Sequence, residues 1–508
     1  MKTAALQRTL WYLSLAAVLL LTAISCNRDN PVGPGDHLAA TGSRRKVQAV
    51  TDTIRGRVEA MRGLTFQRDV HAGILTRKEY QERFYETDWD SDTEQKAVSD
   101  FVTRMMRQTG YIRRSDSVET IFEQQAEMYG EFADAFYRRG RDSLYVIVGD
   151  ELSEKVIDSV LASPGFRPLI AHELIHALQD QALEDELQRY EDLEVPFYSS
   201  DYHLSRLSLI EGDASYFQFR YWYEYVFGDT NYVQLTKDWV EDRFTTFFLN
   251  IHDHNLMPPE YLSVMMWGPY AIGPDWVCQY SENWAALDAR FGDPPLSTTE
   301  VVTREDVEPV RFDFEPLYEL FDFTNRDVMV DVLGGLLVSV LVHGLDPEGL
   351  GALDALKATY GWRGDRLLYE DAGEGSMGTF IWAFSFDDTQ HSMRVWNALR
   401  HFHDQSDSDY YRPHFDSVAT DSTGTYSRVS RFFAGSHRSY LALEDTRVYW
   451  IDNLGGDSDV ALDRLLQGKG LARSRAAGNT ELRNQLYKYL PKRHRRRRGL
   501  SFHSKARG

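Results

Sequence analysis

The sequence predicts an α+β fold that is mainly α-helical, with a short strand or small sheet before a buried helix. Several long segments of the 508-residue chain repeat apolar residues at helical spacing. Only short runs, such as 144–148 and 428–452, have the β-branched content or alternation typical of strands. Hydrophobic residues make up 43% of the chain and aromatic residues 13%. This composition is sufficient for a sizeable core and excludes global disorder.

Residues 1–25 have the features of a secretory signal peptide. Lys2 and Arg8 precede an apolar run that is shorter than the about 20 residues needed to span a bilayer. The run ends in Ala-Ile-Ser before Cys26, which resembles the bacterial lipobox, although Ala23 stands where that motif usually has Leu. An ordinary signal peptide followed by an unrelated cysteine is the alternative. We expect an exported protein of the bacterial cell envelope, anchored to the membrane through lipidated Cys26 and facing the periplasm or the exterior.

The rest of the chain divides into four predicted regions. Residues 26–50 are polar and contain Gly and Pro, as expected of a flexible, lipid-attached tether. A catalytic core is expected over 51–300. An acidic stretch then leads into a helical and strand subdomain, 301–455, packed on the core. The Gly- and Arg-rich residues 456–508 are expected to be disordered.

Charge and cysteine content exclude two classes of protein. The net charge of −21 argues against general nucleic-acid binding, and no nucleic-acid partner is expected. Cys26 and Cys278 are the only cysteines, which excludes a disulfide framework. Residues 492–508 carry eight basic side chains and no acidic one. This basic end could contact anionic lipid or nucleic acid, or simply be solvated.

The local patterns predict the elements in the following order. An amphipathic helix is expected over 115–140, followed by a strand at 144–148. A helix is expected from Pro168, which suits a first turn, to about Glu186. The next helix starts at a cap provided by Ser199, Ser200 or Asp201 and ends at about Tyr225. An apolar helix is expected over 331–342, and a strand pair over 428–452.

The segment around residues 172–176 has the spacing of a metal site. His172 and His176 are four positions apart, which on a helix is a rotation of about 40°, so both imidazoles project from one side. Two nitrogens one turn apart suit the tetrahedral ligand shell of zinc. Glu173 lies beside them, where its carboxylate can take a proton from a metal-activated water. A pair of satisfied core histidines is the alternative, but the apolar surroundings would make unpaired His and Glu costly.

A catalytic zinc ion requires a third protein ligand. Ala182 stands where a metzincin would have its third histidine, so the best candidate is Glu211 on the next predicted helix. His203 and the cluster 252–254 are rival ligands, and a surface role for Glu211 is the alternative.

Three further residues are weaker candidates. Asp180 could orient an imidazole, whereas Asp213 falls on nearly the opposite helical face from Glu211. Surface or helix-packing roles are the alternatives for both. Tyr270 is a candidate for stabilising the developing oxyanion, with core packing as the alternative.

The motif HExxH at 172–176, followed by a Glu on a later helix, resembles the gluzincin metallopeptidases of the thermolysin-like clan. The chain is more closely similar to a family of uncharacterised bacterial lipoprotein-type metallopeptidases. This second resemblance covers about residues 55–450 and includes, in order, the segments 62–64, 145–148, 172–180, 209–214, 269–273, 294–300 and 361–365. The resemblance implies a gluzincin-like zinc-helix core.

The resemblance also implies a function. One catalytic Zn²⁺ would be bound by His172, His176 and Glu211, with Glu173 as the general base in hydrolysis of a peptide or protein substrate. The chain departs from the thermolysin pattern at Ser215, where an Asp is expected one turn after the Glu ligand. The resemblance therefore does not identify the residues that hold the ligands in place. The competing hypothesis is a non-catalytic envelope lipoprotein in which the metal is structural.

Overall fold

The structure is a computed structural model. It describes residues 41–82, 93–112, 133–149, 152–183, 199–250, 260–307, 328–345, 352–373, 376–404, 417–422, 427–454 and 457–466, with a few single residues between 309 and 320. The predicted signal peptide and Cys26, the cluster 252–254 and the basic end at 492–508 lie outside the described residues.

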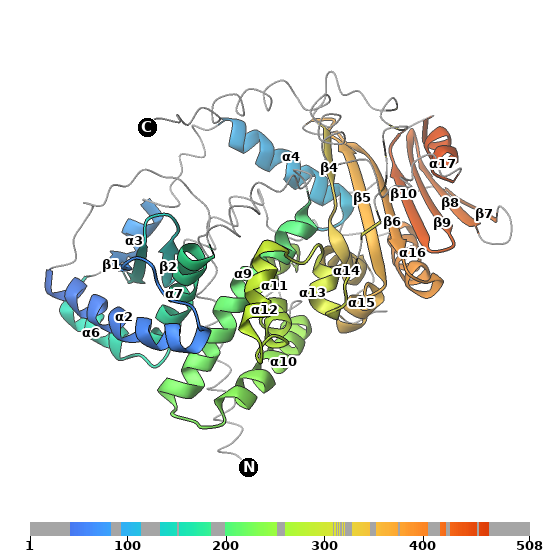
Figure 1. Ribbon diagram of the computed structural model, residues 1–508. Helices are drawn as coiled ribbons and strands as arrows, with labels where there is room; N and C mark the ends of the chain where they lie inside the picture. The colour runs from blue at the N-terminus through green and yellow to red at the C-terminus, as the bar shows by residue number, and fades with distance from the viewer. Residues whose placement is uncertain are drawn as a thin grey trace, which may run out of the picture.

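A three-stranded sheet lies at one end of the molecule (Figure 1). Its strands are β1 (His71–Thr76), β2 (Ala135–Arg138) and β3 (Ser143–Val148). β3 pairs parallel with β1 and antiparallel with β2. The strand predicted at 144–148 is therefore confirmed, and it is the interior strand of a small sheet that precedes the helix carrying the HExxH motif.

The helix predicted over 115–140 is wrong in its described part. Residues 135–138 form β2, and Gly140, with a φ of 67°, belongs to the turn that joins β2 to β3. The aromatic side chains explain the difference. Phe136 stacks on Tyr145 of β3 at 5.1 Å between ring centroids, so this segment packs as a hairpin and not as one face of a helix.

In the part of the chain that the structure describes, four helices lie beside the small sheet. These helices are α2 (Thr41–Arg62), α3 (Arg77–Tyr80), α6 (Glu154–Ala162) and α7 (Phe166–Ala182). α2 begins at Thr41, so residues 41–50 of the predicted tether are helical. α7 is the helix predicted from Pro168, and nearly all of its side chains are buried.

The middle of the molecule is built from helices. α9 (Ser200–Tyr221) is capped by Ser199, one of the three cap candidates from the sequence. The Ser199 side chain accepts a hydrogen bond from the Tyr202 backbone N–H. The helix continues into a π-helical turn, η2 (Trp222–Val226). The remaining helices of this region are α10 (Tyr232–Asn250), α11 (Glu260–Cys278), α12 (Trp284–Gly292) and α13 (Thr298–Thr303).

Glycines allow α9 and α11 to approach each other closely. A Cβ atom on Gly212 would lie 2.4 Å from the backbone carbon of Gly273, and one on Gly273 would lie 2.1 Å from the Ser208 carbonyl oxygen. Real Cβ atoms do not tolerate such distances, so both positions exclude larger residues. Gly212 is next to Glu211, and this helix contact therefore fixes the part of α9 that carries the predicted third ligand.

A seven-stranded antiparallel sheet occupies the other end of the molecule (Figure 1). Its strand order is β4-β5-β6-β10-β9-β8-β7. The strands are β4 (Val328–Asp331), β5 (Trp362–Glu370), β6 (Thr379–Phe386), β7 (Ser417–Ser422), β8 (Ser427–Ala434), β9 (His437–Glu444) and β10 (Arg447–Asp452). The strand pair predicted at 428–452 is three strands, β8 to β10.

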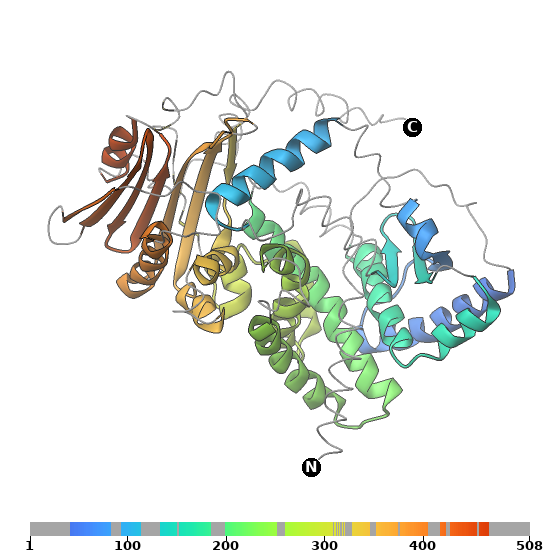
Figure 2. The same ribbon diagram turned by 180° about the vertical axis from the view of Figure 1, so that it is seen from behind.

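Five helices accompany this sheet. They are α4 (Thr93–Thr109), α14 (Gly334–Leu345), α15 (Ala352–Ala358), α16 (Thr389–Asp404) and α17 (Ser458–Leu466). α4 lies beside β4 and β5 although it is far from them in sequence (Figure 2), and Arg104 pairs with Asp371 at 2.6 Å. α14 begins later than predicted, because Asp331 belongs to β4. α17 falls within 456–508, so that predicted tail is helical in its described part.

One hydrophobic core joins the two ends of the molecule. Its buried side chains run from α2 and the small sheet through α9 and α11 to one face of the large sheet, and a second cluster lies beneath α17. The fold is thus mainly helical with two sheets, consistent with the predicted α+β class. Among the described residues, none of the helices combines the length and apolar character that crossing a membrane requires.

Candidate metal centre

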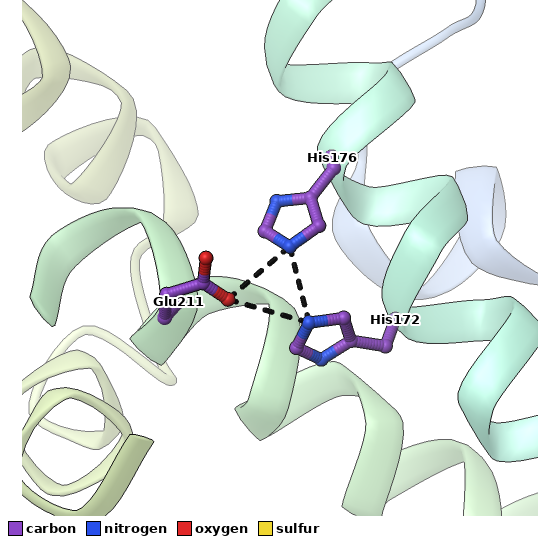
Figure 3. A group of neighbouring side chains, drawn as sticks. All are labelled: His172, His176 and Glu211. Carbon is purple, nitrogen blue, oxygen red and sulfur yellow. Dashed lines mark hydrogen bonds and ion pairs between the residues drawn. The ribbon is translucent and has the colours of Figure 1, made fainter. Parts of the chain in front are cut away.

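Two packed helices bring the predicted ligands together. α7 carries His172 and His176 on one side, as their spacing of four requires, and α9 packs against α7 with Glu211 facing the two imidazoles (Figure 3). All three residues are buried, with exposed fractions of 0% for His172, 7% for His176 and 3% for Glu211. Nearly all of α7 and the part of α9 around Glu211 are buried, so these three polar side chains lie in an apolar environment.

The facing atoms of these residues form a compact triangle. The Nε2 atoms of His172 and His176 are 3.0 Å apart. Glu211 Oε2 lies 3.4 Å from Nε2 of His172 and 3.3 Å from Nε2 of His176. These atoms are close enough to bind one metal ion together.

The donor set fits zinc. Zinc binds histidine nitrogen and carboxylate oxygen at about 2.0–2.2 Å in a tetrahedral arrangement, which separates two ligand atoms by about 3.3 Å. The observed separations of 3.0–3.4 Å match this value. Glu211 Oε2 is also buried and has no partner in hydrogen-bonding geometry among the described residues. Its charge is therefore balanced either by a protonated imidazole of the pair or by a cation bound within the triangle.

Glu173 lies next to the triangle, and its carboxylate is held by the small sheet. Its Oε2 accepts a hydrogen bond of 2.7 Å from the backbone N–H of Tyr137 in β2. Burial raises the pKa of Glu173 to about 8, despite the opposing effects of His176 and the Tyr137 N–H. A carboxyl group with a pKa near neutrality is suited to take up a proton and to release it again.

In the protein without metal, the pKa values of the three ligand side chains shift in different directions. Burial lowers the pKa of His172 to about 4, so this imidazole is neutral. Burial opposes the charge on His176 as well, but the Glu211 carboxylate outweighs it and raises the pKa of His176 to about 9. Burial likewise opposes the charge on Glu211, yet the two imidazoles lower its pKa to about 2. The site therefore favours an ionised Glu211, as metal binding requires.

Three residues, Gln179, Asp213 and Arg62, form a chain of contacts behind His176. Gln179 Oε1 lies 3.0 Å from His176 Nδ1, and Gln179 Nε2 donates to Asp213 at 3.0 Å. Asp213 also forms an ion pair of 3.0 Å with Arg62, and both side chains are fully buried. Asp213 is a weak candidate from the sequence. Gln179 and Arg62 occur there only within the resembling segments 172–180 and 62–64, and their roles depend on contacts between distant segments.

Asp180 does not contact an imidazole in the structure. Its carboxylate accepts hydrogen bonds of 2.7 Å from the Tyr137 hydroxyl and 2.9 Å from the Gly140 N–H, and pairs with Arg139 at 3.1 Å. These contacts anchor the β2–β3 hairpin on α7. Helix packing, the alternative for Asp180, is therefore its observed role, and it helps to fix Tyr137 beside Glu173.

The other candidates have different outcomes. Tyr270 of α11 is buried beside the site, with its ring stacked on that of His172 at 6.1 Å between centroids. His203 is exposed on α9 and does not belong to the group of ligands.

A second acidic group, Asp387, Asp388 and His391, surrounds the first turn of α16, where Asp388 accepts backbone N–H bonds. Such groups are common at helix starts without a metal.

The chain was compared with models of protein families, with curated proteins and with solved structures, and no match was found in any of them.

Proposed function

We propose that the protein is a zinc-dependent peptidase. The observation that carries the proposal is the triangle formed by His172, His176 and Glu211, with the Glu173 carboxylate fixed beside it. Two imidazoles and one carboxylate are the ligand set of catalytic zinc sites that keep a fourth position for water or substrate. A site that only stabilises the fold has no use for an adjacent carboxylate.

Each residue has a distinct part in the reaction. His172, His176 and Glu211 would hold the ion, which when bound would supply Lewis-acid chemistry for the scissile carbonyl and for a water molecule. Glu173 takes a proton from the attacking water, whose oxygen bonds to the carbonyl carbon. The C–N bond then breaks, and Glu173 gives the proton to the leaving amine. The Tyr137 N–H keeps the Glu173 carboxylate in place during both transfers.

The N-terminal pattern adds a location to this function. Because residues 1–25 resemble a signal peptide and Cys26 a lipidation site, we propose that the peptidase is exported and lipid-anchored. Its substrates would then be peptides or proteins of the cell envelope or the exterior.

A structural metal is the second candidate function. The observation in its favour is the burial of the ligands, none of which is more than 7% exposed. In this case the ion would hold α7 against α9, and Glu173 would serve only as an acceptor for the Tyr137 N–H.

Substitution of the proposed base separates the two functions. Glu173→Gln keeps an acceptor oxygen for Tyr137 but cannot take up a proton. We expect zinc content equal to wild type and a loss of hydrolysis of at least about 100-fold, measured on a fluorogenic peptide library. Glu59→Gln is a matched control, because Glu59 also accepts a backbone N–H, from Phe66 at 2.9 Å, away from the site. Equal hydrolysis by Glu173→Gln and wild type would exclude Glu173 as the base.

A further inference from the structure

The amide orientation of Gln179 is determined by its surroundings. Its Nε2 atom lies 3.0 Å from the backbone carbonyl oxygen of Ile210 and 3.0 Å from Asp213 Oδ2. A carbonyl oxygen can only accept hydrogen bonds, so the atom facing it must be the NH₂ group. The other end of the amide, Oε1, therefore faces His176 Nδ1 at 3.0 Å.

This orientation fixes which nitrogen of His176 keeps its hydrogen when the ring is neutral, the form that binds a metal. Because Gln179 Oε1 is an acceptor, His176 Nδ1 must carry the hydrogen. The lone pair of the ring is then on Nε2, the atom that lies 3.3 Å from Glu211 Oε2 and 3.0 Å from His172 Nε2. The side chain that holds Nδ1 thus directs the lone pair of Nε2 toward the position where a metal would be bound.

Gln179 is itself held by a buried ion pair. Arg62 donates through Nε to Asp213 at 3.0 Å and through Nη2 to Asp288 at 2.6 Å. The side chains of Arg62 and Asp213 are both 0% exposed, and the guanidinium lies 5.8 Å from the ring centroids of Phe217 and Trp284. A pair enclosed in this way has little freedom to move, and it connects the end of α2 and the middle of α9 and of α12 to the helix that carries both histidines.

We propose that Gln179 is a positioning residue of the metal centre, held by Asp213 and Arg62, and that it sets the tautomer and orientation of His176. The inference rests on the metal centre proposed above. The Asp expected one turn after Glu211 is replaced by Ser215, and the support comes instead from α7 itself, three positions after the ligand. The support is a neutral amide, so the Nδ1 proton stays on the histidine.

Zinc affinity tests this role directly. We expect Gln179→Ala to weaken zinc binding by about 10- to 100-fold, measured by competition with a chromophoric chelator. Gln181→Ala is the matched control. Gln181 is a buried glutamine of the same helix that bonds Gln67, Arg68 and Asp142 and no ligand. Its substitution should reduce thermal stability without changing zinc affinity.

A further measurement distinguishes positioning from packing. In protein loaded with Co²⁺, the visible absorption bands of the ion should shift in Gln179→Ala and remain unchanged in Gln181→Ala.

The failures of the two proposals are distinguishable. If wild type binds no zinc, the metal centre is wrong whatever Gln179 does. If wild type binds zinc and Gln179→Ala binds it equally tightly with an unchanged Co²⁺ spectrum, the positioning role is wrong and the metal centre stands. If Gln181→Ala weakens zinc binding as much as Gln179→Ala, the effect comes from general destabilisation of α7, which also overturns the role.

Discussion

Glu211 and Asp331 are both buried carboxylates, and their surroundings shift their pKa values in opposite directions. Burial disfavours the charge on each. Two imidazoles face Glu211 and lower its pKa to about 2. Asp331 accepts hydrogen bonds only from neutral donors of Ser200 and Val332, and burial raises its pKa to about 6. The carboxylate that faces the two imidazoles, Glu211, suits a ligand, whereas Asp331 fastens β4 to the start of α9.

The raised pKa of Asp331 predicts a stability that falls as pH rises. Its ordinary value is 3.8, so between about pH 4 and pH 6 the folded protein retains a proton that the unfolded chain releases. The stabilising contribution is complete below pH 3.8 and is lost as pH rises through 6, a change of about 3 kcal/mol. Asp331→Asn lacks this titration. The difference in melting temperature between Asp331→Asn and wild type should therefore move in favour of the variant from pH 4 to pH 7.

Asp293→Asn is the control, because that side chain is 87% exposed and forms a long ion pair of 3.7 Å with Arg290. Its melting curve should run parallel to that of wild type. A difference between Asp331→Asn and wild type that stays constant over this range would contradict the assignment.

At the residue scale, the sequence predicts the candidate ligands better than it predicts the residues that hold them in place. His172 and His176 are recognised because a helix converts a spacing of four into one shared face. Glu211 is recognised because a lone carboxylate is unusual within an apolar helical segment. Gln179 has no such signal, since its role depends on Asp213 and Arg62, and Arg62 is 117 positions away from Gln179.

At the element scale, the contact between α9 and α11 makes a sharp prediction about two glycines. Gly212→Ala places a methyl group 2.4 Å from the backbone of Gly273, so the helices must separate. We expect a loss of about 1–3 kcal/mol in stability. Because Gly212 is next to Glu211, zinc affinity should fall as well.

Gly56→Ala is the matched substitution, and we expect it to raise stability instead of lowering it. Gly56 lies in α2, and a Cβ added there meets nothing within 4 Å. Alanine has the higher helix propensity, so stability should rise by about 0.5–1 kcal/mol. Thermal unfolding of both variants beside wild type checks the pair. A Gly212→Ala protein as stable as wild type would show that the helices do not pack as described.

The elements that the sequence predicts well are those with local signals. The strand at 144–148 has β-branched residues, and α9 has Ser199 as a cap. β6 gives no such signal, because all eight of its side chains are buried and it therefore lacks the alternation by which half-buried strands are recognised. The start of α14 at Gly334, with a φ of 82°, depends on Asp365 of β5, which accepts the Gly334 N–H at 2.8 Å.

At the scale of the whole molecule, the candidate site is built by segments that are distant in the sequence. α7 and α9 supply the ligands, the small sheet holds Glu173 through Tyr137, and α2 supports Gln179 through Arg62. The large sheet lies at the other end and is joined to the site by the common core. The sequence predicts the α+β class, but it does not predict a seven-stranded sheet. β5 and β6 are buried along almost their whole length and lack alternation, and the pairing of β6 with β10 joins segments that are far apart in the chain.

Metal analysis of purified wild type beside Glu211→Ala tests the central claim most directly. We expect about one zinc ion per wild-type chain and a content well below that in Glu211→Ala, because two imidazoles alone leave the ion one protein ligand short. Glu59→Ala, which removes a carboxylate that does not belong to the triangle, should retain zinc. A wild-type protein without zinc, or a Glu211→Ala protein with the wild-type amount, would contradict the metal centre formed by His172, His176 and Glu211.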